Sequence, residues 1–187
     1  MFTVMKFFLR FNNLFIFFFI VLLSSCKTNY NIVSKLPIEK KTESAFYSRY
    51  SEKLGVKLTG TEDKKLLSYI AEWLGAPYKY GGSTIHGTDC SGMVLAVYRD
   101  VYSISLFRSS ADQIKNVVPI EKNKLKAGDL VFFKINGDKV SHVGIYIAED
   151  KFIHSSTKRG VVINSLNDEY YKKYFFTGGR VIKNPIK

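Results

Sequence analysis

The chain is poor in the residues from which metal sites and disulfide frameworks are built. Of its 187 residues only two are cysteines and three are histidines. Two cysteines do not make a disulfide framework. Close ligand pairs such as CxxC or HExxH are also missing, which leaves zinc as a weak alternative. We therefore expect neither a metal nor a cofactor.

Acidic residues are scarce relative to basic ones, 16 against 28, and the formal net charge is +12. Such a balance favours an anionic partner (nucleic acid, a membrane surface or an acidic polymer), although a basic surface also serves solubility. Because the sequence lacks a dense Lys/Arg cluster, a basic helix and an aromatic RNA-binding pattern, we expect no nucleic-acid partner. The length allows one globular domain with a sizeable core.

The N-terminal apolar run is too short for a comfortable membrane span. It covers ten residues, Leu14 to Leu23, and follows the basic residues Lys6 and Arg10. A basic start followed by a short apolar run predicts an export signal over residues 1–25. The alternative is an uncleaved anchor helix over residues 7–23. Either reading places the body of the protein outside the cytoplasm.

The apolar run ends in Leu-Ser-Ser-Cys, with the cysteine at position 26. This tetrapeptide resembles the bacterial lipobox, and the resemblance implies cleavage before Cys26 and lipid modification of that residue. Several acyl chains would hold the protein stably on a membrane. We expect residues 26–61 to be a tether, within which residues 44–54 form a short helix that packs on the domain. The protein is expected to be a monomeric envelope lipoprotein facing the periplasm, with the outer membrane favoured over the inner.

From residue 62 onward the sequence predicts helices first and strands afterwards. Helical spacing and caps predict helices over 62–74 and 90–102, with Asp89 as the N-cap of the second, and one or two helical turns over 109–116. A glycine-rich loop, residues 75–88, separates the two helices. Runs rich in β-branched and aromatic residues predict four strands, over 129–135, 140–148, 151–156 and 160–165. A short helix over 167–176 and a last strand over 179–182 complete an α+β domain, residues 62–187.

Cys90 lies where the second helix begins. Helix N-termini carry partial positive charge and free N–H groups, which favour a thiolate, lower the cysteine pKa and can donate to an oxyanion. The alternative is a small residue packed under the helix. With Cys26 lipidated, Cys90 has no disulfide partner, and a single leftover thiol in an exported protein favours a reactive role.

A nucleophilic cysteine needs a base, and only His86, His142 and His154 are available. His142 and His154 lie on consecutive predicted strands. If the turn between them has three residues, His154 faces Gly144, and His142 is its diagonal neighbour on the same face. A two-residue turn would place the histidines on opposite faces. His86, in the glycine-rich loop, is expected to be an ordinary polar residue.

Four ordered motifs, PYKYGG…GTDCSGMV, KAGDLVFF, SHVGIYI and FIHSS, resemble those of the NlpC/P60 cell-wall peptidases. The resemblance covers about residues 64–182 and includes a narrower likeness to one lipoprotein endopeptidase of the family. It implies a papain-like α+β fold with N-terminal helices packed on a central antiparallel β-sheet.

The resemblance also implies roles for individual residues. Cys90 would be the nucleophile, His142 the general base and His154 the residue that orients it, with Tyr78 beside the nucleophile near the oxyanion. Asp89 and Ser91 match positions that in some members contact a free amino group of the substrate. Arg108 keeps its place in LFRSSADQ as a substrate-binding candidate, although Phe107 replaces the proline usual in this segment.

The implied activity is hydrolysis of an amide bond in peptidoglycan stem peptides or cross-links. Two bonds remain open, γ-D-glutamyl-diaminopimelate and D-alanyl-diaminopimelate, and the narrower likeness favours the cross-link. The alternatives are a non-catalytic envelope module that binds wall peptides, and an amidase or acyltransferase on the same scaffold.

Overall fold

The computed structural model describes residues 38–182, so the predicted export signal, Cys26 and the start of the predicted tether lie outside the described residues. The helices are α2 (Ile38–Leu54), α3 (Lys64–Trp73), α4 (Cys90–Tyr102), α5 (Ser110–Gln113) and α6 (Glu169–Tyr174), with 3₁₀ turns η2 (Ile114–Asn116) and η3 (Lys122–Lys124). The strands are β1 (Ser83–Thr84), β2 (Gly87–Thr88), β3 (Val117–Ile120), β4 (Leu130–Phe133), β5 (His142–Ala148), β6 (Lys151–Ser156), β7 (Gly160–Ser165) and β8 (Phe175–Val181). The chain divides into two compact units after Thr42, and the second unit contains α2 from Glu43 onward and every later element.

Helices α3 and α4 form where the apolar spacing predicted them, and an N-capping aspartate precedes each. Asp63 accepts hydrogen bonds from the N–H groups of Lys65 and Leu66, and Asp89 accepts one from Gly92. These caps satisfy N–H groups that have no partner within the helix. The cap at Asp89 fixes the start of α4, and with it the position of Cys90.

The six long strands form one antiparallel sheet in the order β3-β8-β4-β5-β6-β7. Strands β6 and β7 have the predicted bounds, and β8 starts earlier than expected. The sequence analysis missed β3, a four-residue edge strand that contains Pro119 and pairs only with β8. A proline is tolerated there because an edge strand leaves one side of its backbone unpaired. The predicted α+β fold, with helices packed on a central antiparallel sheet, is confirmed.

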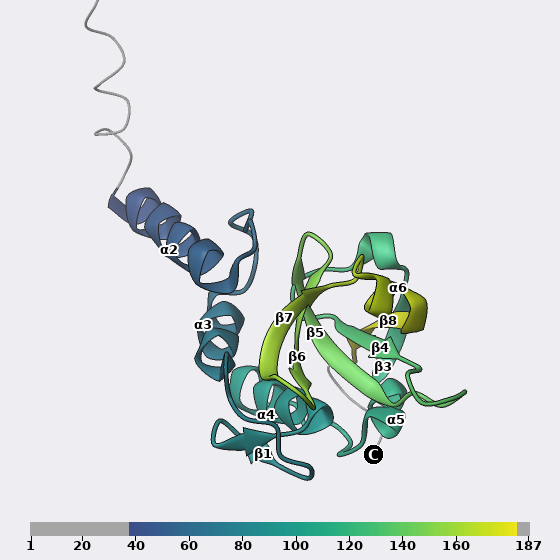
Figure 1. Ribbon diagram of the computed structural model, residues 1–187. Coiled ribbons are helices and arrows are strands. Elements are labelled where there is room, and N and C mark those ends of the chain that lie inside the picture. Colours follow the sequence, from purple (N-terminus) through teal and green to yellow (C-terminus); the bar gives the residue numbers. More distant parts are fainter. Residues whose placement is uncertain (1–37, 183–187) are drawn as a thin grey trace, which may run out of the picture. The chain divides into compact units, whose positions relative to one another are not determined.

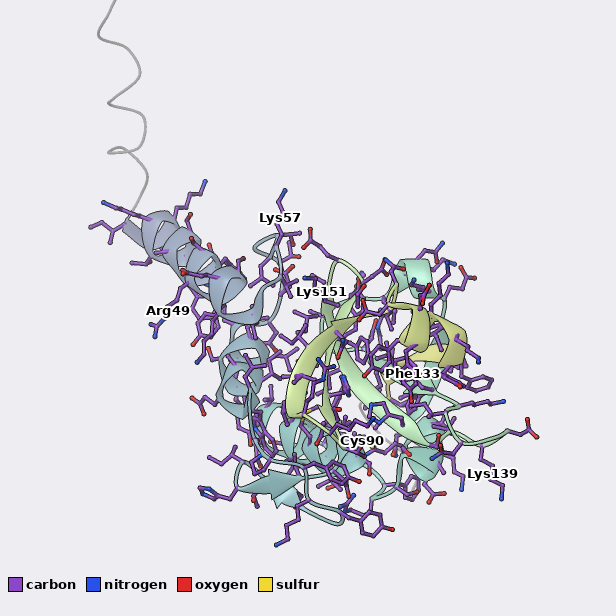
Figure 2. The ribbon with its side chains drawn as sticks, in the orientation of Figure 1. Arg49, Lys57, Cys90, Phe133, Lys139 and Lys151 are labelled. Atoms are coloured by element: carbon purple, nitrogen blue, oxygen red, sulfur yellow. The ribbon has the colours of Figure 1, made fainter. Side chains whose placement is uncertain are left out.

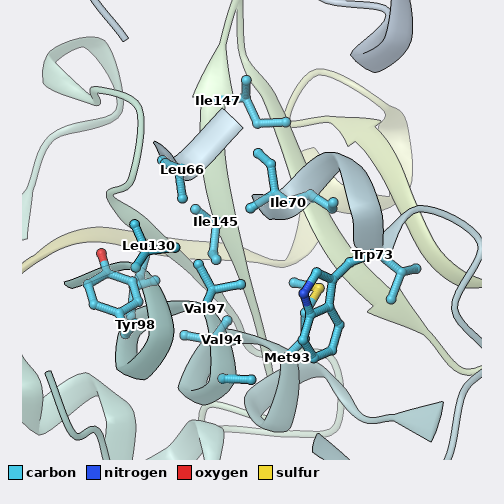
Figure 3. Packing of buried hydrophobic residues seen from close by; sticks show 14 of the residues in the cluster. Leu66, Ile70, Trp73, Met93, Val94, Val97, Tyr98, Leu130, Ile145 and Ile147 are labelled. Carbon is cyan, nitrogen blue, oxygen red and sulfur yellow. The ribbon is translucent and has the colours of Figure 1, made fainter. Parts of the chain in front are cut away.

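The main core lies between helices α3 and α4 and one face of the sheet (Figure 1). Figure 3 shows Met93, Val94 and Val97 of α4 facing the strands. From the sheet, Val143, Ile145 and Ile147 of β5 enter this core with at most 1% of their surface exposed. The alternation predicted for β5 is therefore confirmed, and it leaves His142 and Gly144 for the opposite face.

A second, smaller core covers that opposite face. It consists of Val131, Phe133, Phe152, Leu166 and Tyr171, the last of which belongs to α6. Phe152 and Tyr171 also pack against the ring of His154. Helix α6 thus closes the side of the sheet on which the histidines lie.

The second half of α2 also packs on the domain. Tyr47 and Leu54 belong to the main core, and the Tyr47 hydroxyl donates to the backbone oxygen of Glu62 at 2.7 Å. The short helix predicted over residues 44–54 is therefore present as part of α2, with Tyr47 and Leu54 buried against the domain. Among residues 38–182, no helix is long and apolar enough to cross a membrane.

Of the two turn lengths considered between β5 and β6, the structure has the two-residue turn. Only Glu149 and Asp150 separate the strands, and both have positive φ, 50° and 58°. The pairing register of β5 and β6 shifts between Tyr146 and Ala148, which makes Ile147 the extra residue of a β-bulge. On the side of the bulge away from the turn, Ile145 pairs with Ile153 and Tyr146 with Phe152. This is the register that a three-residue turn would give. The bulge thus restores the register that places His142 and His154 on the same face, which the two-residue turn alone would not give.

Gly144 lies between the two histidines at the closest approach of β5 and β6. A Cβ atom at this position would lie 2.7 Å from Cδ2 of Phe152, 2.8 Å from the oxygen of Ile153 and 3.2 Å from Cβ of His154. The backbone of Gly144 has no positive φ, so the requirement for glycine here is one of space.

We predict that Gly144→Ala destabilises the fold, because the added methyl group has no room between β5 and β6. Overpacking of this kind costs about 1–3 kcal/mol, which in a protein of this size lowers Tm by about 2–10 °C. Thermal unfolding followed by circular dichroism measures the change. Val118→Ala, at a 49% exposed position of the edge strand, is the control and should leave Tm nearly unchanged. An unchanged Tm for Gly144→Ala would contradict the packing described here.

Candidate active site

Cys90 is the first residue of α4, a free thiol that is partly buried between the helix and β5 (Figure 2). Backbone N–H groups of Val143, Ser91 and Cys90 itself lie close enough to the sulfur to stabilise a thiolate. Val143 follows His142 directly in the chain, so this contact places the thiol beside the start of β5. The helix start and the first histidine strand therefore meet at Cys90.

The predicted lowering of the Cys90 pKa is wrong for the free protein. Burial raises the pKa of the thiol above its ordinary value of 9.0, and the charge of Asp89 raises it further. The nearby N–H groups lower it by a smaller amount. At neutral pH Cys90 is therefore a neutral thiol, and a base must remove its proton when it attacks.

His142 and His154 lie on the same face of the sheet, as a catalytic histidine pair requires. The two rings are joined by a hydrogen bond of 2.9 Å between Nε2 of His142 and Nδ1 of His154. The rings are nearly perpendicular, at 86°. His154 is only 1% exposed, whereas His142 is half-buried and open to the surface beside it. The Nδ1 atom of His142 takes no part in this hydrogen bond.

A chain of hydrogen bonds beyond His154 fixes which ring nitrogens carry protons. Arg159 donates to Oδ1 of Asn164 at 2.6 Å, and Nδ2 of Asn164 donates to Asp168 at 2.9 Å. Because arginine only donates and a carboxylate only accepts, the amide of Asn164 has one possible orientation. Its Oδ1 also lies 3.1 Å from Nε2 of His154 and must accept the proton there.

The remaining protons follow from this orientation. With Nε2 of His154 protonated, its Nδ1 is an acceptor, so the proton in the bond to His142 belongs to Nε2 of His142. Nδ1 of His142 is consequently unprotonated. Tyr171, whose hydroxyl lies 3.2 Å from Nε2 of His154, is a second acceptor for the same proton. The network thus leaves His142 with a free basic nitrogen.

Both histidines are neutral in the free protein. Burial lowers the pKa of His142 well below its ordinary value, and the neighbouring His154 lowers it further. Burial likewise lowers the pKa of His154, and the positive charge of Arg159 acts in the same direction. The pair can therefore accept a proton without first losing one.

Tyr78 lies close to the nucleophile, as predicted. Burial raises the pKa of its hydroxyl, and the next largest cause is the nearby Cys90. The backbone of Tyr78 forms a parallel bridge with Thr88, two residues before Cys90. Its hydroxyl is therefore a protonated donor within electrostatic range of the sulfur.

Asp89, Ser91 and Arg108 form one network beside Cys90. Arg108 donates to both carboxylate oxygens of Asp89, at 2.9 and 2.6 Å, and to Oγ of Ser91 at 3.0 Å. Asp89 also accepts from the N–H groups of Gly81 and Gly92. The hydrogen bonds to Arg108, Gly92 and Gly81 hold the pKa of Asp89 below its ordinary value even though burial acts against them. The carboxylate is fully engaged within the protein, and its contact with a substrate amino group stays a prediction.

Two further expectations concern metal and His86. His86 is exposed in the loop between β1 and β2, apart from the other two histidines. Across residues 38–182 no group of three or more histidine, cysteine, aspartate or glutamate side chains is arranged to hold a metal ion. The site described here consists of a thiol, two imidazoles and hydrogen-bonding groups.

Comparison with known proteins gives consistent results. The model of the NlpC/P60 family matches residues 75–180, a range that contains Cys90, His142 and His154. The chain is 36% identical over 165 residues to the murein DD-endopeptidase MepS/murein LD-carboxypeptidase of Escherichia coli, covering 87% of each chain. It is 37% identical to a probable endopeptidase NlpC homolog of Haemophilus influenzae, covering 78% of this chain and 76% of the other.

The chain belongs to the NlpC/P60 family. A solved structure of a family member from Bacillus cereus is 33% identical and superimposes with a TM-score of 0.59, covering 63% of this chain and 39% of the other. The resemblance inferred from the four motifs, including the narrower likeness to a lipoprotein endopeptidase, is confirmed. NlpC/P60 proteins are cysteine peptidases, and the chain is an enzyme of that class.

A groove of about 490 Å³ opens beside the histidine pair. His142 and His154 form part of its wall, and Tyr170 and Tyr171 of α6 form another part. The turn between β6 and β7 contributes Lys158 and Arg159. A substrate in this groove lies beside the side chain of His142.

The sequence analysis missed Asn164 and Tyr171 as members of the site. Asn164 lies on β7, where His154 pairs with Val162, so Asn164 is the diagonal neighbour of His154 on the same face. The alternation that brought His142 to His154 would have found Asn164 if it had been extended by one strand. Tyr171 reaches the site from α6 and had no comparable signal in the sequence.

We predict that Asn164→Leu changes the proton positions in the histidine pair. Leucine is similar in size but offers no acceptor, so Nε2 of His154 can instead accept from Tyr171 and the pair can reverse its polarity. Side-chain ¹H–¹⁵N spectra at neutral pH show which nitrogens are protonated. In the wild type, Nδ1 of His142 should be bare and its Nε2 protonated. The variant should show a substantial fraction of the opposite tautomer.

Asn167→Leu is the matched control for this experiment. Asn167 is an exposed neighbour on the same connection, bonded to Asp150 and Ser165 and not to a histidine. Its replacement should leave the imidazole spectra unchanged. A wild-type spectrum with protonated Nδ1 of His142, or an Asn164→Leu spectrum identical to the wild type, would refute the assigned network.

Proposed function

We propose that the chain is a lipid-anchored peptidoglycan endopeptidase that cuts an amide bond of murein stem peptides or cross-links through Cys90, His142 and His154. The hydrogen-bonded histidine pair beside a free thiol is the observation that carries this proposal. Relatives named as murein endopeptidases support the substrate class. Of the two candidate bonds, the D-alanyl-diaminopimelate cross-link is favoured, because a relative named a DD-endopeptidase is similar over 87% of both chains.

In the first step the sulfur of Cys90 attacks the carbonyl carbon of the scissile amide. The thiol proton passes to Nδ1 of His142, which the network leaves unprotonated. His142 then carries a positive charge, and the bond from its Nε2–H to His154 orients the ring and stabilises the cation. This proton transfer is required because burial keeps the resting thiol neutral.

The negative oxygen of the tetrahedral intermediate requires hydrogen-bond donors. The N–H of Gly92 is already taken by Asp89 at 2.7 Å. The N–H groups of Cys90 and Ser91 at the start of α4, together with the Tyr78 hydroxyl, are therefore the proposed donors. Groups of this kind contribute most when they are held in place before the charge develops.

Collapse of the intermediate breaks the C–N bond. His142 returns its proton to the leaving amine, and the acyl group remains on Cys90 as a thioester. Water, deprotonated by His142, then attacks the thioester and releases a carboxylic acid and the free thiol. No metal or cofactor takes part in this proposed sequence, and the catalytic groups end in their starting states.

The remaining parts of the proposal concern location. The lipobox at Cys26 would hold the enzyme on a membrane facing the wall polymer, and similarity to proteins that act on murein supports an envelope location. A basic protein is also suited to an anionic envelope. We propose the outer membrane as the site of anchoring.

We predict that Cys90→Ala abolishes hydrolysis of purified peptidoglycan. Removing a nucleophile of this type lowers the rate by several orders of magnitude, since only binding and oxyanion donors remain. Digests analysed by mass spectrometry would show released muropeptides with the wild type and none with the variant. The masses of the products identify the bond and separate an endopeptidase from an amidase or an acyltransferase.

Cys90→Ser is the matched control for folding, because it changes only the sulfur atom. It should fold like the wild type and be severely impaired. If the wild type and Cys90→Ala release the same fragments, the hydrolase proposal fails, and a non-catalytic module that binds wall peptides becomes the better account.

A further inference from the structure

The groove beside His142 contains two cations and no acidic side chain. Lys158 and Arg159 line it, together with hydroxyl groups of Ser156, Thr157 and Tyr170. Hydroxyl groups and cations can all donate hydrogen bonds, whereas a carboxylate in the lining would repel an anion. The chemistry of this wall therefore suits a negatively charged group.

The two cations are not neutralised by the protein itself. Neither Lys158 nor Arg159 forms an ion pair with a carboxylate of residues 38–182. Arg159 uses one terminal nitrogen to bind Asn164, which leaves further guanidinium donors for a ligand. Both side chains are exposed at the groove and accessible to a substrate.

The turn that carries the cations is held rigidly. It follows β6 and ends at Gly160, which has a positive φ of 69° and packs against the backbone of Ala76. The next residue, Val161, donates its backbone N–H to the oxygen of Ala76 at 2.8 Å and accepts from the N–H of Gly75 at 2.9 Å. The turn is thereby fixed to the loop that leads to Tyr78. A fixed position reduces the entropy lost when a ligand binds.

We propose that Lys158 and Arg159 form a subsite for a free carboxylate of the stem peptide, located within one or two residues of the scissile amide. This inference rests on the proposed function and adds selection by charge to it. The cations line the same groove as His142, so a carboxylate bound there would lie on the His142 side of the scissile bond. Stem peptides carry such groups on γ-linked glutamate and on diaminopimelate.

The subsite would also connect substrate binding to the base. Arg159 donates to Asn164, which in turn accepts the proton of His154. The positive charge of Arg159 works against protonation of His154. A bound carboxylate offsets that charge and so favours the transfer of the thiol proton to the histidine pair. Substrates with the carboxylate should therefore show a higher kcat as well as a lower KM.

The test compares two synthetic muropeptides that are identical except that the carboxylate flanking the scissile amide is free in one and amidated in the other. The wild type should cut the free form with about tenfold higher kcat/KM, the effect of a charge-assisted hydrogen bond. Lys158→Gln should reduce this preference several-fold, through a loss of kcat/KM that is larger for the free peptide than for the amidated one. Lys158→Glu should reverse the preference.

Lys57→Gln is the control variant. Lys57 is an exposed lysine whose backbone binds Glu149, at the end of β5 away from His142, and Figure 2 shows it far from Cys90. It should keep the full preference. Binding of both peptides to Cys90→Ala protein, measured by calorimetry, gives a second readout that does not depend on turnover and should show the same preference.

The outcomes separate this inference from the proposed function. Equal cutting of both peptides by the wild type overturns the carboxylate subsite and leaves the endopeptidase intact. A preference that survives in Lys158→Glu also overturns it. If neither peptide is cut and neither binds, the proposed function fails and the subsite fails with it.

Discussion

One extra residue in strand β5 determines whether the two histidines can meet. The turn at Glu149 and Asp150 has two residues, and with regular strands it would place His142 and His154 on opposite faces. The bulge at Ile147 shifts the register so that both side chains reach the same face. Bulges commonly re-aim side chains next to active sites, and this one has that effect at the centre of the sheet. The position of the base, and hence the proposed chemistry, depends on it.

Burial and hydrogen bonding together set the electrical state of the site. Burial is the largest cause that raises the pKa of Cys90 and lowers the pKa of both histidines, so that the thiol and the imidazoles are neutral. Hydrogen bonding then decides where the protons lie, because Arg159 and Asp168 orient Asn164, and Asn164 orients His154. Neutral groups avoid the cost of burying separate charges. His142 and the carbonyl oxygen of the substrate would become charged only when the sulfur attacks the carbonyl carbon.

Local patterns predicted much of the structure. Apolar spacing and a capping aspartate placed α4 and therefore Cys90, and alternation placed the core face of β5. The family resemblance correctly identified the fold. What failed was set by tertiary context. The bulge is invisible in the sequence because Ile147 alternates normally with its neighbours, and the edge strand β3 depends on its partner β8.

The pKa of Cys90 was predicted in the wrong direction for a related reason. A helix start favours a thiolate, but the sequence does not reveal how deeply the thiol is buried, and burial outweighs the helix. Asn164 was missed because its role exists only when β7 lies beside β6. Residues that act through a neighbour on another strand are the ones that sequence patterns report least.

At rest, Cys90 and His142 form a neutral couple rather than an ion pair. The rate of Cys90 alkylation by iodoacetamide, measured across the pH range, tests it directly because only the thiolate reacts. A neutral couple gives a rate that is low at neutral pH and rises with a midpoint above the ordinary thiol pKa of 9.0. A rate that is already at its plateau near neutral pH would instead show that the resting site holds a thiolate–imidazolium pair.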